Sequence, residues 1–214
     1  MIDQIKIGCA STKTIYGERL DTALIELNPD AKISGLFTSN KFKSAPVQIC
    51  LKQLKKKMKG KKMLAINAGN ANAATGKKGV SDAKKLIREI SSLTDISTTQ
   101  ILPFSTGVVG QLLDVKSLSV AFSKCLKNLN KNSWEDFAKA IMTTDTKSKI
   151  VKLSLQVGSK KYHIVGIAKG VGMIEPNMAT TLSYIFTDLR IPELTLRKLH
   201  KKICDKTFNA ISID

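Results

Sequence analysis

The sequence lacks the features of a membrane protein or a disulfide-rich protein. No run in its 214 residues approaches the 18 or more consecutive apolar residues of a membrane span, and the N-terminus has no signal-peptide core. The cysteines are widely separated and form no Cys-x-x-Cys pair, which predicts neither a zinc site nor a disulfide framework. We therefore expect a globular cytoplasmic protein. Its four cysteines, expected to be buried small hydrophobes, are Cys9, Cys50, Cys125 and Cys204.

Metal and nucleotide motifs are also missing. His163 lies in a strand-like run and His200 in a helical one, so the two histidines are not expected to bind a metal together. The Asn/Gly-rich segment 67–76 has neither the glycine spacing nor the Lys-Ser/Thr ending of a P-loop. Gly170 and Gly172 are not followed by the third glycine of a dinucleotide site. We therefore expect no metal and no cofactor.

Acidic residues, arginine and aromatics are all scarce. There are 35 Lys and Arg residues against 17 Asp and Glu, a net charge of +18, and such a field attracts nucleic acid or anionic lipid. Arginine, which favours bidentate contacts with phosphates and bases, occurs at only four positions, and aromatics make up 5%. The densest basic cluster, 52–62, contains apolar residues at helical spacing and resembles a solvated helix face. A nucleic-acid-binding domain is therefore the less favoured alternative.

Apolar periodicity and turn residues predict a mixture of strands and helices. The sequence is 43% hydrophobic, which is enough for a buried core. The order of elements predicts an α/β or α+β domain with helices packed on central mixed sheets. The predicted strands are 22–27, 32–38, 62–67, 100–104, 150–157, 161–167, 181–187 and 211–214. The predicted helices are 47–58, 81–93, 116–129, 133–142 and 192–208.

Local signals refine this prediction. Asn28-Pro29-Asp30 is expected to form the turn between the first two strands. Gly158-Ser159 is expected to join 150–157 to 161–167 as a hairpin. Ser133 is expected to be an N-cap.

The segment 169–182 leads directly into a candidate nucleophile. Its glycines, proline and asparagine predict an irregular lead-in, and an apolar strand follows. The Thr180 hydroxyl could attack the carbonyl of Ala179, and hydrolysis of the resulting ester would leave Thr180 as a new N-terminus. The free α-amine would then be the general base beside its own hydroxyl. Read alone, Thr180 is an ordinary threonine at the start of a strand, and Thr181 offers a second hydroxyl.

Five sequence blocks, in order, resemble the ornithine acetyltransferases (glutamate N-acetyltransferases) of the cyclic arginine pathway. The self-cleavage motif Lys-Gly-x-Gly-Met-Ile-x-Pro-Asn-Met-Ala-Thr matches residues 169–180. The other four blocks lie at 37–47, 67–76, 105–110 and 141–146.

The resemblance implies a self-processing acyltransferase fold and cleavage between Ala179 and Thr180. Residues 1–179 are then the α-chain, and 180–214 begin a β-chain whose remainder is missing. We expect this chain to be the N-terminal part of a hetero-oligomer of α- and β-chains.

The resemblance also implies roles for individual residues. Thr106 and Gly107 are expected to be oxyanion-hole donors, because a turn after a strand can present adjacent N–H groups. Ser105-Thr106-Gly107 by itself is only a turn signal. Thr143, with Thr144 as the alternative, and Lys169 are expected to bind substrate together with Thr180. Lys169 could steer a carboxylate and lower the pKa of a nearby amine, although a surface lysine is the plain reading.

The implied reaction is acetyl transfer through an acetyl-threonine intermediate. Thr180 attacks the acetyl carbonyl of N-acetylornithine, ornithine leaves, and the amine of glutamate then takes the acetyl group. Some family members also accept acetyl-CoA, and no residue here decides between the donors. The alternative within enzymology is a self-processing aminopeptidase or amidase of similar architecture, in which water is the acceptor.

Overall fold

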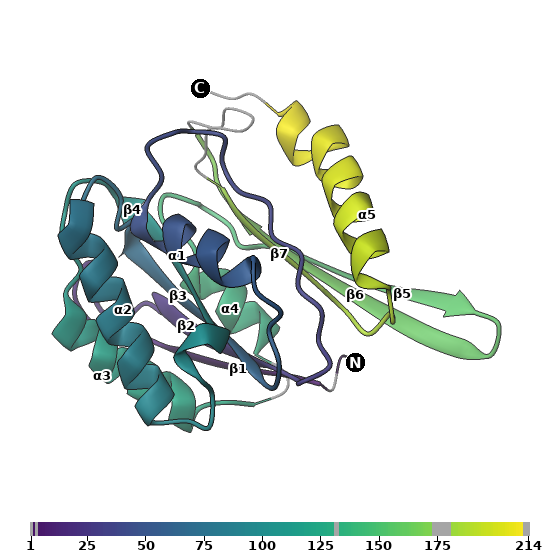
Figure 1. Ribbon diagram of the computed structural model, residues 1–214, viewed down its shortest axis with the longest axis horizontal. Helices are drawn as coiled ribbons and strands as arrows, with labels where there is room; N and C mark the ends of the chain where they lie inside the picture. Colours follow the sequence, from purple (N-terminus) through teal and green to yellow (C-terminus); the bar gives the residue numbers. More distant parts are fainter. Residues whose placement is uncertain (1, 3, 131–132, 173–180, 212–214) are drawn as a thin grey trace.

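The computed structural model describes residues 2, 4–130, 133–172 and 181–211 (Figure 1). These residues form a four-stranded sheet and a three-stranded sheet, with helices packed around them. The first sheet, sheet A, has the order β1-β2-β3-β4. The β1–β2 and β2–β3 pairs are antiparallel, and β3–β4 is parallel. Its strands are β1 (Ile5–Ala10), β2 (Thr22–Leu27), β3 (Lys62–Asn70) and β4 (Ile101–Val108).

Sheet A is buried on both faces. Alternate residues of a strand point to opposite faces, so Leu24 of β2 packs in one apolar cluster, whereas Ala23 and Ile25 pack in the other. The helices α2 (Gly76–Ser92) and α3 (Val115–Lys127) contribute to the first cluster. The other cluster lies between sheet A, the helix α4 (Trp134–Ala140) and the second sheet. This is why β2 and β3 appear in the sequence as nearly continuous apolar runs.

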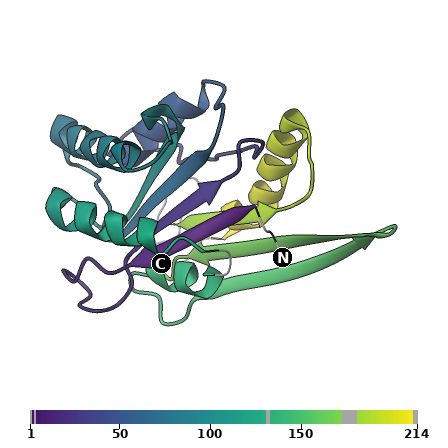
Figure 2. The same cartoon turned by 90° about the horizontal axis from the view of Figure 1, so that it is seen from below.

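The second sheet, sheet B, is antiparallel with the order β5-β6-β7. Its inner face packs aromatic side chains against α4: the Tyr184 and Phe137 rings are 5.0 Å apart and the Phe186 and Trp134 rings 5.1 Å apart. The β5–β6 hairpin extends beyond the rest of the molecule (Figure 2). The strands of sheet B are β5 (Lys149–Val157), β6 (Lys160–Lys169) and β7 (Leu182–Thr187).

The remaining helices lie at the periphery. The helix α1 (Ala45–Leu54) packs on β4 and α2. The helix α5 (Glu193–Lys206) has no buried residue and stands apart from the other helices in Figure 1. His200 of α5 contacts Ser34, with 2.9 Å between Nδ1 and Oγ. None of the helices that the described residues form has the length and apolar character needed to cross a membrane.

Most predicted elements are confirmed, with shifted ends. The hairpin of β5 and β6 and the strands β2, β3 and β7 form as expected, and all five predicted helices are present. Ser133 is the N-cap of α4, although its hydroxyl donates to Asn130 and does not cap the helix. The helix α2 begins at Gly76, five residues earlier than predicted. Of the predicted strand 211–214, only Ile211 is described, and it belongs to no strand.

Two predictions about sheet A are wrong, and one strand was missed. Residues 32–38 do not form a strand, because β2 is already paired with β1 on one side and β3 on the other. Ser105–Gly107 is not a turn, since β4 continues to Val108 alongside β3. The strand β1 was not anticipated.

The cysteines fit the expected structural role only in part. All four are free thiols; Cys50 and Cys125 are buried, whereas Cys9 and Cys204 are half-buried. Burial raises the pKa of Cys50 to about 12, so this thiol stays protonated at neutral pH.

Tyr184 provides a test of the core between the sheets. Its side chain is buried, and its hydroxyl finds no hydrogen-bond partner among the residues that the structure describes. Tyr184→Phe removes an unsatisfied polar group without a change of shape, so the protein should be equally stable or more stable, by up to about 1–3 kcal/mol. Tyr184→Ala leaves a cavity and should cost about 3–5 kcal/mol. Urea unfolding measures both; a large loss in Tyr184→Phe would mean that the hydroxyl is satisfied.

Candidate active site

Lys169 is the centre of the candidate site. It is the last residue of β6, and alternation along the strand places it on the inner face together with Val165 and Ile167. Its side chain is buried, and Nζ donates hydrogen bonds to Thr106 Oγ1 at 3.1 Å and Thr143 Oγ1 at 2.7 Å. Three predicted site residues therefore meet, from β6, from β4 and from the loop after α4.

This contact bears on two alternatives that the sequence left open. Lys169 is not a surface lysine, because only 5% of it is exposed. Thr143, and not its neighbour Thr144, supplies the hydroxyl that contacts Lys169.

The electrostatic environment of Lys169 is mixed. Burial lowers its pKa from the usual 10.5, the negative charge of Asp145 opposes that change, and the positive charge of Lys149 adds to it. The ammonium therefore loses its proton more readily than an exposed lysine does. Its two hydroxyl partners accept hydrogen bonds and still carry protons of their own to donate.

Thr106 and Gly107 lie at the carboxyl end of β4, beside the end of β3. Ligands of sheets with parallel strands bind preferentially at such ends. Gly107 has a φ of 132°, and a Cβ built on it would lie 2.2 Å from the carbonyl carbon of Gly69. Glycine is therefore required here by close packing of the two strands, a reason that the sequence did not indicate.

The Asn-rich block supports this strand end. Ser105 Oγ donates to Asn67 Oδ1 at 2.6 Å, and Asn67 Nδ2 donates to the carbonyl of Asn70 at 2.9 Å. Asn72 Nδ2 donates to the carbonyl of Gly79 at 3.0 Å. These side chains hold the backbone after β3 in place, which explains the block in structural terms.

Sequence reasoning missed Asp145. Its side chain is 1% exposed and accepts hydrogen bonds from Lys149 Nζ at 2.6 Å and from the N–H groups of Gly170 at 2.9 Å and Thr143 at 3.3 Å. Burial alone would raise the pKa of Asp145, but the hydrogen bonds from Lys149, Gly170 and Thr143 outweigh burial and lower it. The only signal in the sequence is its place two residues after Thr143.

The proposed nucleophile and cleavage site, Thr180 and Ala179, lie outside the described residues. The described chain resumes at Thr181, and Leu182 is the cross-strand partner of Lys169. In the sequence, Thr180 is therefore two residues from the partner of Lys169.

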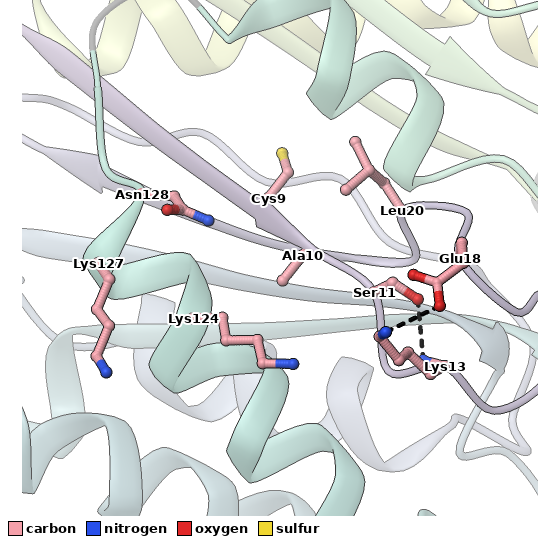
Figure 3. Close-up of a pocket in the computed structure, with 9 residues that line it drawn as sticks. All are labelled: Cys9, Ala10, Ser11, Lys13, Glu18, Leu20, Lys124, Lys127 and Asn128. Carbon is pink, nitrogen blue, oxygen red and sulfur yellow. Dashed lines mark hydrogen bonds and ion pairs between the residues drawn. The ribbon is translucent and has the colours of Figure 1, made fainter.

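A surface cavity of about 330 Å³ lies elsewhere, between the end of β1, the β1–β2 loop and α3 (Figure 3). Two lining residues, Lys124 and Lys127, are in the last turn of α3, where the helix dipole favours positive charge. Figure 3 also shows the ion pair of Lys13 and Glu18 on its wall. None of the predicted site residues that the structure describes lines this cavity. Within the described ranges, no group of three or more His, Cys, Asp or Glu side chains is arranged as a metal site.

Comparisons with known sequences agree with one another. The sequence profile of the ArgJ family matches residues 5–214. The arginine biosynthesis bifunctional protein ArgJ of Colwellia psychrerythraea is 39% identical over 222 residues, covering 100% of this chain and 52% of the relative. The protein of the same name from Methylococcus capsulatus is 35% identical over 210 residues, covering 98% and 51%. The chain thus spans about half the length of the curated relatives it matches.

Solved structures give the same fold. The arginine biosynthesis bifunctional protein ArgJ of Bacillus halodurans matches with a TM-score of 0.67 and 28% identity, over 82% of this chain and 91% of that one. The ornithine acetyltransferase of Mycobacterium tuberculosis, solved in complex with ornithine, matches with a TM-score of 0.66 and 25% identity, over 81% and 91%. A Pyrococcus horikoshii protein, at 14% identity and a TM-score of 0.52, shares the fold alone.

The buried charge of Lys169 predicts a pH-dependent difference in stability. Because burial lowers the pKa of Lys169, the folded state holds this proton less tightly than the unfolded state. The cost of the charge is complete below the lowered pKa and disappears as the pH rises towards 10.5. Lys169→Met should therefore be at least as stable as the parent at pH 7, and the difference should shrink by pH 10. Urea midpoints at the two pH values test this, and a constant difference would contradict it.

Proposed function

The chain belongs to the ArgJ family, and we propose that within the full-length protein it supplies the nucleophile and the acyl-binding side of an acetyltransferase. The reaction is transfer of the acetyl group from N-acetylornithine to glutamate in arginine biosynthesis. One observation carries the proposal: the buried ammonium of Lys169 contacts the hydroxyls of Thr106 and Thr143. The bound ornithine of the Mycobacterium tuberculosis structure supports the substrate class.

The same proposal includes self-cleavage between Ala179 and Thr180. This chain covers 91% of the two solved relatives but only about half of the curated ones, so the solved chains are much shorter. The matched shares of this chain, 82% and 81%, are close to the share of the chain that precedes Thr180, which is 179 of 214 residues. Both comparisons support an α-chain of residues 1–179 and a β-chain that opens with Thr180.

The chemistry follows from groups with defined roles. The Thr180 hydroxyl attacks the Ala179 carbonyl, and the peptide C–N bond breaks, which frees the Thr180 amine with a reference pKa of about 7.7–8.0. Water then hydrolyses the ester, which releases the Ala179 carboxylate and regenerates the Thr180 hydroxyl. This amine takes the hydroxyl proton as the same oxygen attacks the acetyl carbonyl of N-acetylornithine. Ornithine leaves with a proton, and the amine of glutamate then attacks the acetyl-threonine ester. N-acetylglutamate and the free Thr180 hydroxyl are the products.

Thr106 and Lys169 assist this step, and Thr143 contacts the Lys169 ammonium. Since Thr106 Oγ1 accepts a hydrogen bond from Lys169, its own proton points elsewhere and can donate to the oxyanion. Gly107 contributes its adjacent backbone N–H. An ammonium has three N–H donors, and two of them contact hydroxyls. The third can bind a substrate carboxylate.

The outer face of sheet B offers a surface for a further chain segment of the whole protein. Its outer face carries exposed apolar residues along β5, which a partner must cover to remove them from water. We propose that the protein's own β-chain is that partner and that the assembly acts in the cytoplasm. These outward residues are Val151, Leu153, Leu155 and Val157.

Intact-mass analysis of the full-length protein tests the processing. It should show two polypeptides, one ending at Ala179 and the other beginning at Thr180. Thr180→Ala should give one uncleaved mass and no acetyl transfer, whereas Thr180→Ser keeps a hydroxyl and should retain some of each. An active parent with a single mass would refute the mechanism. Cleavage in Thr180→Ala would move the assignment to Thr181.

The products separate acetyl transfer from hydrolysis. Full-length protein given N-acetylornithine and glutamate should form N-acetylglutamate in proportion to the ornithine released. If acetate forms instead, water is the acceptor and the protein is an amidase of similar architecture.

Thr106→Ala tests the oxyanion role. Loss of one preorganised donor costs roughly 2.7–4 kcal/mol of barrier, or about 10²–10³ in turnover. The effect should appear in kcat, and self-cleavage should be affected less than acetyl transfer. Thr106→Ser retains the hydroxyl and serves as the matched control. Turnover of Thr106→Ala equal to that of the parent would remove Thr106 from the mechanism.

A further inference from the structure

Thr143 lies in a segment that has no regular structure to hold it. Residues 141–148, here called the Thr143 loop, connect α4 to β5 and belong to no helix or strand. The hydroxyl of Thr143 nevertheless lies 2.7 Å from Lys169 Nζ. The position of this loop must therefore be set by contacts from other parts of the chain.

Arg19 holds the loop from one side. It belongs to the β1–β2 loop, residues 11–21, and its guanidinium donates from Nη2 to the carbonyl of Met142 at 2.9 Å and from Nη1 to the carbonyl of Thr143 at 3.5 Å. The guanidinium also stacks on the Tyr16 ring, 3.7 Å from its centroid. The planar, preorganised fork of arginine fixes direction as well as distance.

Asp145 holds the loop from the other side. Its Oδ2 accepts the N–H of Thr143 and its Oδ1 accepts the N–H of Gly170, the residue that follows Lys169. One buried carboxylate thus ties together the backbones on which the two contacting side chains stand. With Arg19, it holds both the N–H and the carbonyl of Thr143.

The β1–β2 loop is itself fixed to the end of β3. Asp21 Oδ1 accepts the N–H of Thr12 at 2.8 Å, and the carbonyl of Asp21 accepts the N–H of Ala68 at 2.7 Å. A Cβ built on Gly69 would lie 2.9 Å from Ile15 Cδ1 and 3.2 Å from Tyr16 Cε2, so this loop packs directly on the strand end. Arg19 therefore connects the β3–β4 end to the Thr143 loop.

We propose that Arg19 and Asp145 are positioning residues that together hold the Thr143 hydroxyl against Lys169. Both act through the backbone of Thr143. The kinetic consequence rests on the proposed function, because Lys169 binds a substrate carboxylate there and Thr143 holds its ammonium. A displacement of about 1 Å in such a contact can cost up to about 10² in kcat/KM. Loss of substrate binding should appear mainly as a higher KM for N-acetylornithine, in contrast to the kcat effect of Thr106→Ala.

The test uses four variants of the full-length protein. Arg19→Met removes the clamp on the carbonyls, Arg19→Lys keeps the charge without the planar fork, and Asp145→Asn removes the buried carboxylate charge. Glu18→Gln is the matched control: it lies on the same loop, its side chain is 81% exposed, and its ion pair among the described residues is with Lys13. Circular dichroism confirms that each variant is folded.

The first readout does not depend on acetyl transfer. Reductive methylation with formaldehyde, followed by peptide mass spectrometry, measures how fast Lys169 is modified relative to Lys62. Lys62 is also buried, 3% exposed, with its Nζ donating to the carbonyls of Pro29 and Gly60, away from the clamp. The Lys169-to-Lys62 ratio should rise several-fold in Arg19→Met and Asp145→Asn, less in Arg19→Lys, and stay unchanged in Glu18→Gln. General loosening of the fold would raise both lysines together.

The second readout is steady-state kinetics with N-acetylornithine. The KM should rise in Arg19→Met, and Arg19→Lys should recover part of the loss. A parent without acetyl transfer would refute the proposed function, while the methylation ratio would still decide the clamp. An unchanged ratio in folded Arg19→Met overturns the proposal even if Asp145→Asn does not fold. So does a ratio that rises equally in Glu18→Gln.

Discussion

The arrangement of the site depends on burying one ammonium group between two sheets. A charged group away from water is costly unless hydrogen bonds replace its hydration. Lys169 meets this requirement with hydroxyls from β4 and from the Thr143 loop, since its own strand provides neither. The charge therefore joins sheet B, the end of sheet A and the loop after α4 at one point.

The apolar packing before Lys169 makes this burial unavoidable. Val165 and Ile167 point from β6 into the cluster between the sheets, and strand alternation directs Lys169 the same way. Tyr184 and Phe186 of β7 pack beside them against α4. The same pairing of β6 and β7 sets Leu182 opposite Lys169, so the strand that follows the proposed nucleophile returns to the site.

Elements with a strong local pattern could be predicted from the sequence, and those defined by distant partners could not. The β5–β6 hairpin has alternation and a glycine turn of its own, so its existence followed from local residues. Residues 32–38 have strand-like composition, but both edges of β2 are occupied, which only the topology reveals. For the site, the sequence blocks pointed to Thr106, Thr143 and Lys169, which the fold brings into contact. They did not identify Arg19, whose contacts with the Thr143 loop span more than 120 positions in sequence.

In a chain this rich in lysine, the sequence does not show which buried lysines serve the fold alone and which belong to the candidate site. Lys62 and Lys169 are both buried, and burial lowers the pKa of each. Lys62 donates to backbone carbonyls, which can only accept, so its contacts end there and fix the start of β3. Lys169 donates to hydroxyls, each of which still has a proton to give. A buried lysine surrounded by carbonyls is satisfied by the fold, whereas one surrounded by hydroxyls orients donors towards a further group. The second arrangement suits an acyl-transfer site, because the negative charge that develops on the carbonyl oxygen needs donors that are already in place.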